Sequence, residues 1–91
     1  MNEDTREILL ILQEECAEVI QMVSKCRRFG IDNTHIKSGE SNRARLTEEM
    51  GDLHCMMKLA ADLGIVDLAE VLAASVAKEE KLRKWSNIFK E

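Results

Sequence analysis

The chain has 91 residues and a formal net charge of −4 at pH 7, with no proline, no tyrosine and a single tryptophan. This acidic balance argues against a nucleic-acid partner, because such proteins rely on clustered Lys and Arg that neutralise phosphates. No apolar run approaches the roughly 18 residues that a membrane helix needs, and the N-terminus lacks the positive start of a secretory signal. We therefore expect one cytoplasmic domain over residues 1–91 with no membrane partner.

The composition favours helices over strands, since only 3% of the residues are aromatic while 45% are hydrophobic and 33% charged. The first predicted helix begins at Asp4, whose carboxylate suits an N-cap while Glu7 completes a capping box. It runs to about Phe29, where Gly30 supplies the stop. The sequence thus predicts an all-α fold that opens on one long helix.

Two further helices follow a connecting loop. Residues 31–42 carry turn formers and little periodicity, and a loop of about a dozen residues is long enough to be functional. The second helix is predicted over residues 43–63 and ends at Gly64. The third is predicted over residues 67–89 with Asp67 as its N-cap, and a break near Ser75 is an open alternative.

Three helices of about 20 to 25 residues each predict an antiparallel helical bundle of three to four helices. Their apolar arcs are broad, so a single chain would leave hydrophobic surface exposed. We therefore expect homo-oligomerisation, as a homodimer or a homotetramer, to complete the bundle.

The first helix carries acidic residues on an otherwise apolar face. At about 100° per residue, this face is formed by Ile8, Leu12, Val19, Val23 and Cys26, with Ile11 and Met22 on its flank. Glu15 falls inside the stripe and Glu18 lies at its edge, whereas Glu14 points toward the polar side. The face that should be buried is therefore interrupted by charge.

The second helix repeats this anomaly. Its apolar arc consists of Leu46, Met50, Leu53, Met56, Met57, Ala60 and Leu63. Glu49 and Asp52 project from the same arc, and burying an ionised carboxylate without a partner costs several kcal/mol or forces its protonation. The two acidic pairs have the same i,i+3 spacing, so both are expected to face the interior.

Four carboxylates that met between two helices would repel one another, and a hard cation such as Mg²⁺ would resolve this with oxygen ligands. The alternative is that each pair is an ordinary solvated or capping charge, which is the better interpretation of either pair alone. The doubled pattern favours a metal site. A zinc site is disfavoured, because His54 and Cys55 are adjacent and point about 100° apart on a helix.

The third helix places lysines on its apolar face. Lys78 shares the bearing of Val71, Leu82 and Trp85, and Lys81 lies one turn later. Each lysine alone is explained by snorkelling, in which the stem covers apolar surface and the ammonium reaches water. Alternatively, the two ammonium groups bind phosphates that accompany the metal.

Several motifs together suggest a family. They are EECAE at residues 14–18, SKCRRFG at 24–30, NR at 42–43 with Leu46, EEMGDL at 48–53 and KEEKLRKW at 78–85. The pattern resembles the EExxE, spacer, ExxD signature of all-α nucleoside triphosphate pyrophosphohydrolases of the MazG family, particularly the short phage-type members. The resemblance covers most of the chain.

This resemblance implies magnesium-dependent cleavage of a nucleoside or deoxynucleoside triphosphate between the α and β phosphates, with Mn²⁺ as a substitute ion. The implied metal ligands are Glu15, Glu18, Glu49 and Asp52, with Glu14 orienting or deprotonating the attacking water. The expected phosphate contacts are Lys78, Lys81, Lys25 and Arg28, and the expected nucleoside contact is Asn42. Lys25 and Arg28 also suit the negative end of a helix, and Asn42 suits an N-cap.

Two alternatives stay open at this stage. The chain could be a non-catalytic helical interaction protein whose apolar arcs form an oligomer interface and whose acidic pairs are rim charges. It could also bind nucleotides without hydrolysing them, or act on an alarmone. The sequence leaves the preferred base and sugar undetermined.

Overall fold

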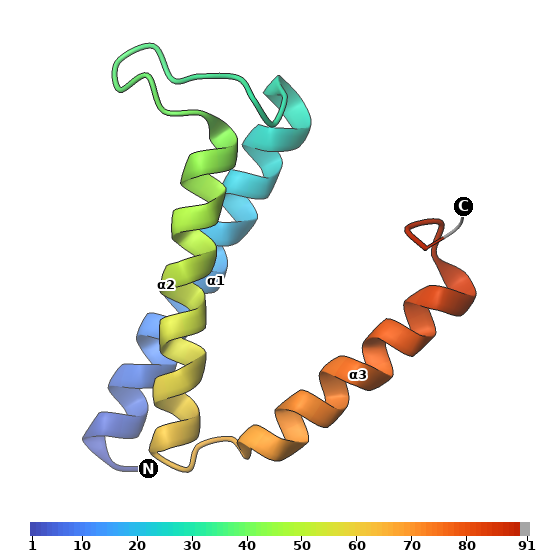
Figure 1. Cartoon of the computed structure of the whole chain (residues 1–91). Coiled ribbons are helices and arrows are strands. Elements are labelled where there is room, and N and C mark those ends of the chain that lie inside the picture. Colours follow the sequence, from blue (N-terminus) through green and yellow to red (C-terminus); the bar gives the residue numbers. More distant parts are fainter. Residues whose placement is uncertain (90–91) are drawn as a thin grey trace.

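A computed structural model describes residues 1–89, which form three helices and no strand. These are α1 (Glu3–Phe29), α2 (Asn42–Asp62) and α3 (Leu68–Trp85) (Figure 1). The only strand-like pairing in this part of the chain is an isolated bridge between Thr34 and Ser41 in the α1–α2 loop. The protein is therefore all-α, as its composition predicts.

The helix α1 starts earlier than predicted. Its N-cap is Asn2 rather than Asp4, and the Asn2 Oδ1 atom accepts a hydrogen bond from the backbone N–H of Thr5 at 2.8 Å. Glu3 and Asp4 then lie in the first turn, where a carboxylate is favoured by the positive end of the helix dipole. The predicted end at Phe29 is confirmed, because Gly30 has a φ of 100°, a conformation that favours glycine.

The helix α2 is capped by Ser41, whose Oγ accepts a hydrogen bond from the Ala44 N–H at 3.0 Å. Asn42 is therefore the first helical residue, and its assignment to the loop or to the N-cap was wrong. The helix ends at Asp62, close to the predicted end, and Gly64 follows with a φ of 74°. Gly64 allows the chain to turn sharply there.

The N-cap predicted for α3 is confirmed, since the Asp67 carboxylate accepts a hydrogen bond from the Glu70 N–H at 2.9 Å. The helix is continuous through Ser75 and ends at Trp85, four residues before the predicted end at Phe89. Ser86 is extended, and its hydroxyl accepts a hydrogen bond from the Ile88 N–H at 3.1 Å. This local turn competes with a further helical turn.

Only α1 and α2 pack along their length, as an antiparallel hairpin. Its core contains Ile8, Met56 and Ala60, with Ile11, Leu12 and Ile65 packed against them. The predicted inward faces are thus confirmed in part. Other members of the same arcs stay uncovered in the single chain, such as Val23, which is 39% exposed, and Met50, which is 53% exposed.

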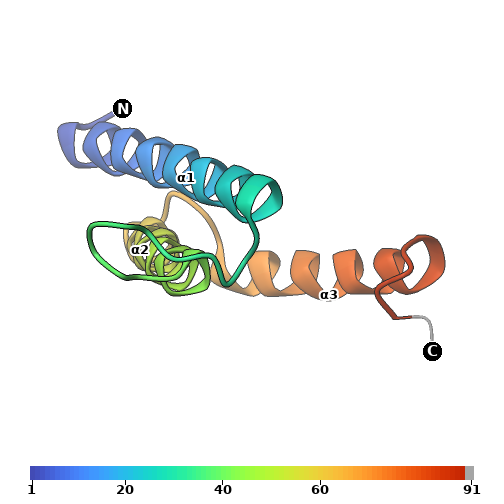
Figure 2. The same ribbon diagram turned by 90° about the horizontal axis from the view of Figure 1, so that it is seen from above.

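The helix α3 leaves the hairpin at an angle, so the chain forms an open V (Figure 1). Seen from above, α3 extends away from α2 (Figure 2). Its radius of gyration of 16.1 Å exceeds the roughly 12 Å expected for a compact domain of this length. None of the helices in residues 1–89 is long and apolar enough to cross a membrane. The bundle in one chain therefore contains two packed helices and one that diverges.

An ordered turn sets the direction of α3. The Ala60 carbonyl oxygen accepts hydrogen bonds from the N–H groups of Ile65 at 2.9 Å and Val66 at 3.4 Å, and Gly64 N–H donates to Ala61 at 3.0 Å. The Ile65 side chain packs against the hairpin core. These contacts satisfy the last carbonyls of α2 and fix the start of α3.

Candidate metal centre

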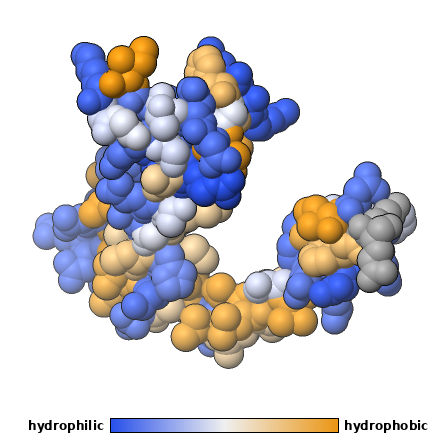
Figure 3. All heavy atoms as spheres, turned by 45° about the horizontal axis from the view of Figure 1, so that its top comes forward, coloured by the Kyte–Doolittle hydropathy of each residue, from blue (hydrophilic) through white to orange (hydrophobic). Residues whose placement is uncertain are grey.

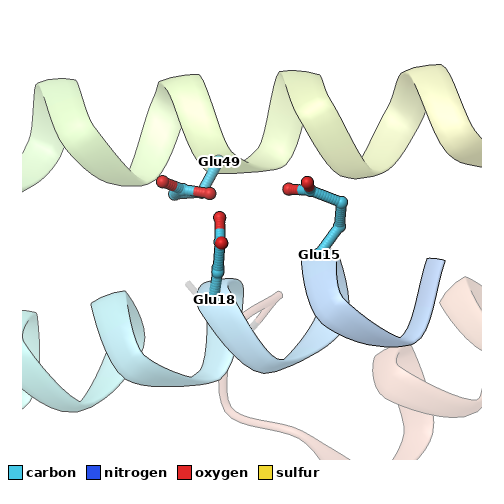
Figure 4. A group of neighbouring side chains, drawn as sticks. All are labelled: Glu15, Glu18 and Glu49. Atoms are coloured by element: carbon cyan, nitrogen blue, oxygen red, sulfur yellow. The ribbon is translucent and has the colours of Figure 1, made fainter. Parts of the chain in front are cut away.

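Three glutamates meet in the middle of the hairpin. Glu15 and Glu18 stand on α1 at i,i+3 spacing, which places them on one face, and Glu49 projects toward them from α2 (Figure 4). Each contributes one carboxylate oxygen to a group whose atoms all lie within 4.8 Å of one another. We call these three residues the carboxylate group.

The carboxylate group contains more acceptors than donors. Glu15 and Glu49 are half-buried, and their Oε2 atoms are inaccessible to solvent and have no hydrogen-bond partner among the described residues. A buried acceptor without a partner is destabilising, and more so when it is charged. The possible metal ligands in this group are carboxylate oxygens alone, and a hard divalent cation prefers such oxygen ligands.

Crowding of like charges changes the protonation of these residues. A hydrogen bond with the Glu18 carboxyl, partial burial and the charges of Glu18, Asp52 and Glu15 raise the pKa of Glu49 to about 7. Burial, followed by the charges of Glu18, Asp52 and Glu14, also raises the pKa of Glu15. At neutral pH the carboxylate group is therefore partly protonated, and a bound cation would displace this proton.

Asp52 lies beside the carboxylate group but outside it. It is exposed, one turn after Glu49 on α2, and its charge raises the pKa of both Glu15 and Glu49. Glu14 is also exposed, on the outer side of α1 as predicted, and acts on the pKa of Glu15. The structure thus brings together three of the four predicted ligands and keeps the fourth close by.

Asn42 joins the ends of α1 and α2. The residue is only 5% exposed, and its Nδ2 donates a hydrogen bond to the Gly30 carbonyl oxygen at 2.9 Å. Its backbone N–H donates to the Asn33 carbonyl at 2.9 Å. These bonds give Asn42 a structural role that the sequence did not indicate, and its contact with a nucleoside stays a prediction.

The predicted basic residues lie away from the carboxylate group in one chain. Arg28, whose guanidinium carbon sits 4.9 Å from the centroid of the Phe29 ring, is ten residues beyond Glu18, or about 15 Å along α1. Lys25 is half-buried in the same end of the helix. Lys78 and Lys81 stand on the diverging α3, so no fold-back within the chain delivers them to the carboxylates.

Arg43 orders the loop, a role that was not predicted from the sequence. Its guanidinium forms an ion pair with Asp32, with Nε to Oδ1 at 2.9 Å and Nη2 to Oδ2 at 3.2 Å. The Arg43 backbone N–H also donates to the Ile31 carbonyl at 2.8 Å. Opposite charges at the two ends of the loop were the available signal, and because both side chains are exposed the pair contributes little stability.

The fold and the carboxylate group define an all-α protein with a candidate site for a divalent cation. A model of the MazG nucleotide pyrophosphohydrolase domain matches residues 3–86, so the chain belongs to this family. No significant match was found among curated proteins or solved structures. The resemblance predicted from the two acidic motifs is therefore confirmed at the level of the family.

Proposed function

We propose that this protein is a magnesium-dependent nucleoside triphosphate pyrophosphohydrolase that yields a nucleoside monophosphate and pyrophosphate. The observation that carries the proposal is the carboxylate group, in which three glutamates from two helices converge without a compensating donor. Membership of the MazG nucleotide pyrophosphohydrolase family supplies the class of substrate. The acidic chain needs a cation between itself and a polyanionic triphosphate.

The residues present fit a magnesium ion. Glu15, Glu18 and Glu49 would hold it through carboxylate oxygens, and Asp52 would add a fourth carboxylate from the next turn of α2. When bound, the ion neutralises the carboxylates, binds phosphate oxygens and lowers the pKa of a coordinated water. Mn²⁺ accepts the same oxygen ligands and is expected to substitute.

Other residues of the chain act on the substrate. Glu14 is a carboxylate next to the group and would accept a proton from the attacking water. Lys25 and Arg28 at the end of α1 would bind phosphate oxygens, and Asn42 would approach the nucleoside with the amide oxygen that its bond to Gly30 leaves available. Lys78 and Lys81 would neutralise the departing pyrophosphate.

The test is an assay of ribo- and deoxyribonucleoside triphosphates with Mg²⁺ and with EDTA, in which the products are separated by chromatography. We expect monophosphate and pyrophosphate in equal amounts, with Mg²⁺ only. In water labelled with a heavy oxygen isotope, the label should appear in the monophosphate, because the attack is on the α-phosphorus. Label in pyrophosphate would contradict that mechanism.

If none of the nucleoside triphosphates were cleaved, the result would instead favour a protein that binds nucleotides without cleaving them. A magnesium titration monitored by thermal melting separates the cases, because metal binding to the folded state raises the melting temperature whether or not catalysis occurs. Substitution of Glu49 by Ala should abolish both the nucleotide cleavage and the rise in melting temperature with Mg²⁺, and it should leave the helix content intact. Loss of helix content would assign Glu49 a structural role.

A further inference from the structure

Asn42 closes the loop end of the hairpin. It is 5% exposed and is the only buried polar residue among residues 1–89. Its Nδ2 donates to the Gly30 carbonyl oxygen at 2.9 Å, and the other donor to this oxygen in the described chain is the Asn33 N–H at 3.3 Å. One side chain thus joins the first residue of α2 to the residue that ends α1.

The spacing of residues along α2 connects Asn42 with the carboxylate group. Asn42, Glu49 and Met56 follow one another at intervals of seven residues, which is about two helical turns or 10.5 Å. All three therefore lie on one side of α2. Asn42 and Met56 are buried on this side. Glu49 points from it toward Glu15 and Glu18 on α1 (Figure 4), midway between the two buried residues.

The two ends of the hairpin are held by different contacts. At the end near α3, hydrophobic atoms gather over the junction of the helices (Figure 3), and the core consists of Ile8, Met56 and Ala60. At the loop end, α2 buries only Asn42 before Glu49. The helix α1 buries only Met22 after Glu18. The hydrogen bond of Asn42 therefore supplies at the loop end a restraint that apolar packing supplies at the other.

The carboxylate group requires such a restraint. Its three carboxylates have oxygen atoms within 4.8 Å of one another, and like charges at this distance push α1 and α2 apart as long as no cation lies between them. Mg²⁺ demands near-octahedral ligands at about 2.0–2.1 Å, and side chains that bind a metal must be held within about 0.5 Å of the required geometry. A small separation of the helices at Glu49 would therefore weaken the binding of an ion that both helices share.

We propose that Asn42 is a positioning residue for the metal centre. Its bond to the Gly30 carbonyl holds α2 at the distance from α1 at which Glu49 shares an ion with Glu15 and Glu18. Asn42 acts from two helical turns away and does not touch the ion. The inference rests on the metal binding of the proposed function, and it is separate from the predicted nucleoside contact, which involves the amide oxygen of Asn42 instead of its donor.

The test uses Mn²⁺ alone, without nucleotide, because the free ion gives a sharp electron paramagnetic resonance signal that is lost on binding. Asn42→Ala removes the amide donor. We expect this variant to bind Mn²⁺ about tenfold more weakly, as do variants that lose a residue orienting a metal ligand. Circular dichroism should show that the helices remain. Wild-type affinity for Mn²⁺ in Asn42→Ala would overturn the positioning role.

The matched control is Ile65→Ala, at the other end of the hairpin, where Ile65 packs against the apolar core. It should lower the melting temperature at least as much as Asn42→Ala, because it removes apolar contacts. Its affinity for Mn²⁺ should stay that of wild type. If both variants weakened Mn²⁺ binding equally, a general loss of stability would explain the effect, and the positioning role would be refuted.

A second substitution covers the case in which Asn42→Ala does not fold. Asn42→Asp keeps the shape of the side chain and suits the first turn of a helix, but an ionised carboxylate cannot donate to the Gly30 carbonyl. Its negative charge would by itself strengthen the binding of a cation. Weaker Mn²⁺ binding by Asn42→Asp is therefore the result expected from lost positioning, and equal or stronger binding would overturn the proposal.

Coupling between Asn42 and Glu49 can be measured without metal. Glu49→Gln removes one of the repelling charges, so it should raise the melting temperature of the metal-free protein near pH 8. The rise should be smaller in the Asn42→Ala background, because helices without the restraint separate and have already relieved the repulsion. Two independent sites about 10 Å apart would give additive shifts, so additive shifts would contradict the proposal.

These outcomes separate the inference from the proposed function. A protein that binds Mn²⁺ in this pattern but cleaves no nucleotide would refute hydrolysis and retain the positioning role. An active protein in which Asn42→Ala raises only the KM for nucleotide, with unchanged affinity for Mn²⁺, would retain hydrolysis and refute the positioning role. A wild-type chain that binds no Mn²⁺ would refute the metal centre and the positioning role together.

Discussion

The hairpin and α3 have similar fractions of apolar residues but different surroundings. In the hairpin, Ile8, Met56 and Ala60 bury one another, and the interruptions of the apolar faces are carboxylates that meet at one place. In α3, Leu72 and Val76 are exposed, and Lys78 and Lys81 stand on other sides of the helix. Helical periodicity thus identifies the side that requires burial, whereas the identity of its partner depends on tertiary and quaternary contacts.

The largest expected effect is on the carboxylate group of the hairpin. Glu49→Gln should lower turnover by a factor on the order of 10²–10³. The substitution removes one ligand of the proposed metal ion, and the charge of this ion stabilises the transition state. Without Mg²⁺ the variant should melt at a higher temperature than wild type near pH 8, since one of the repelling charges is removed. Steady-state kinetics and thermal melting measure the two effects.

The matched control for this substitution is Glu48→Gln, because Glu48 is the exposed neighbour on the outer side of α2. It should keep wild-type turnover and melting temperature. If Glu49→Gln and Glu48→Gln behaved alike, the assignment of Glu49 to the metal would be wrong.

An intermediate effect compares the two hydrophobic surfaces. Met56→Ala, in the hairpin core, should lower the free energy of unfolding by about 2–3 kcal/mol at every protein concentration, because it leaves a cavity. Leu72→Ala, on α3, should cost more at high than at low protein concentration, because Leu72 is exposed in one chain and we expect a second copy to cover it. Urea unfolding at two widely separated concentrations distinguishes them, and a concentration-independent loss for Leu72→Ala would place its contacts within one chain.

The smallest expected effect is a pH dependence confined to the hairpin. The pKa of Glu49 is raised from 4.5 to about 7 in the folded protein. Between pH 4.5 and 7, Glu49 is therefore mostly ionised in the unfolded state but still largely protonated in the folded state. The metal-free protein should therefore lose stability as the pH rises from about 4.5 to 7, with the contribution fully present below this window. Mg²⁺ should reverse the loss above pH 7, because it binds the ionised carboxylates.

Melting temperatures across this range measure the effect, with Glu49→Gln as a variant that should lack most of it. Glu15, whose pKa is also raised, contributes in the same direction. A melting temperature that rose steadily from pH 4.5 to 7 in the metal-free protein would contradict the crowded arrangement of the carboxylates.

Local signals predicted most of the helices and failed where two capping residues competed. Gly30 and Asp67 act alone at their helix ends, and both predictions are confirmed. Asn2 lies two residues before Asp4 and Ser41 directly before Asn42, and in each pair the earlier residue is the cap. Nothing in the sequence around Asn42 indicated its bond to the Gly30 carbonyl, because that contact exists only once the loop is folded.

The carboxylate group could be anticipated because Glu15 and Glu49 interrupt apolar arcs, and the face of a helix is fixed by spacing alone. Which carboxylate of α2 joins the group could not be anticipated, because the offset between the two packed helices decides whether Glu49 or Asp52 lies closer to α1. The divergence of α3 was equally hidden, because it depends on hydrogen bonds at Ala60 that form in the completed turn.

The turn that holds α3 away from its own hairpin also has a kinetic consequence. If activity requires a second chain to cover α3, the amount of active enzyme follows a second-order mass-action law at low concentration. Catalytic output would then grow faster than in proportion to the amount of protein synthesised, until most chains are paired. A few hydrogen bonds at Ala60 and Gly64 would thereby link the rate of nucleotide hydrolysis to the level of expression.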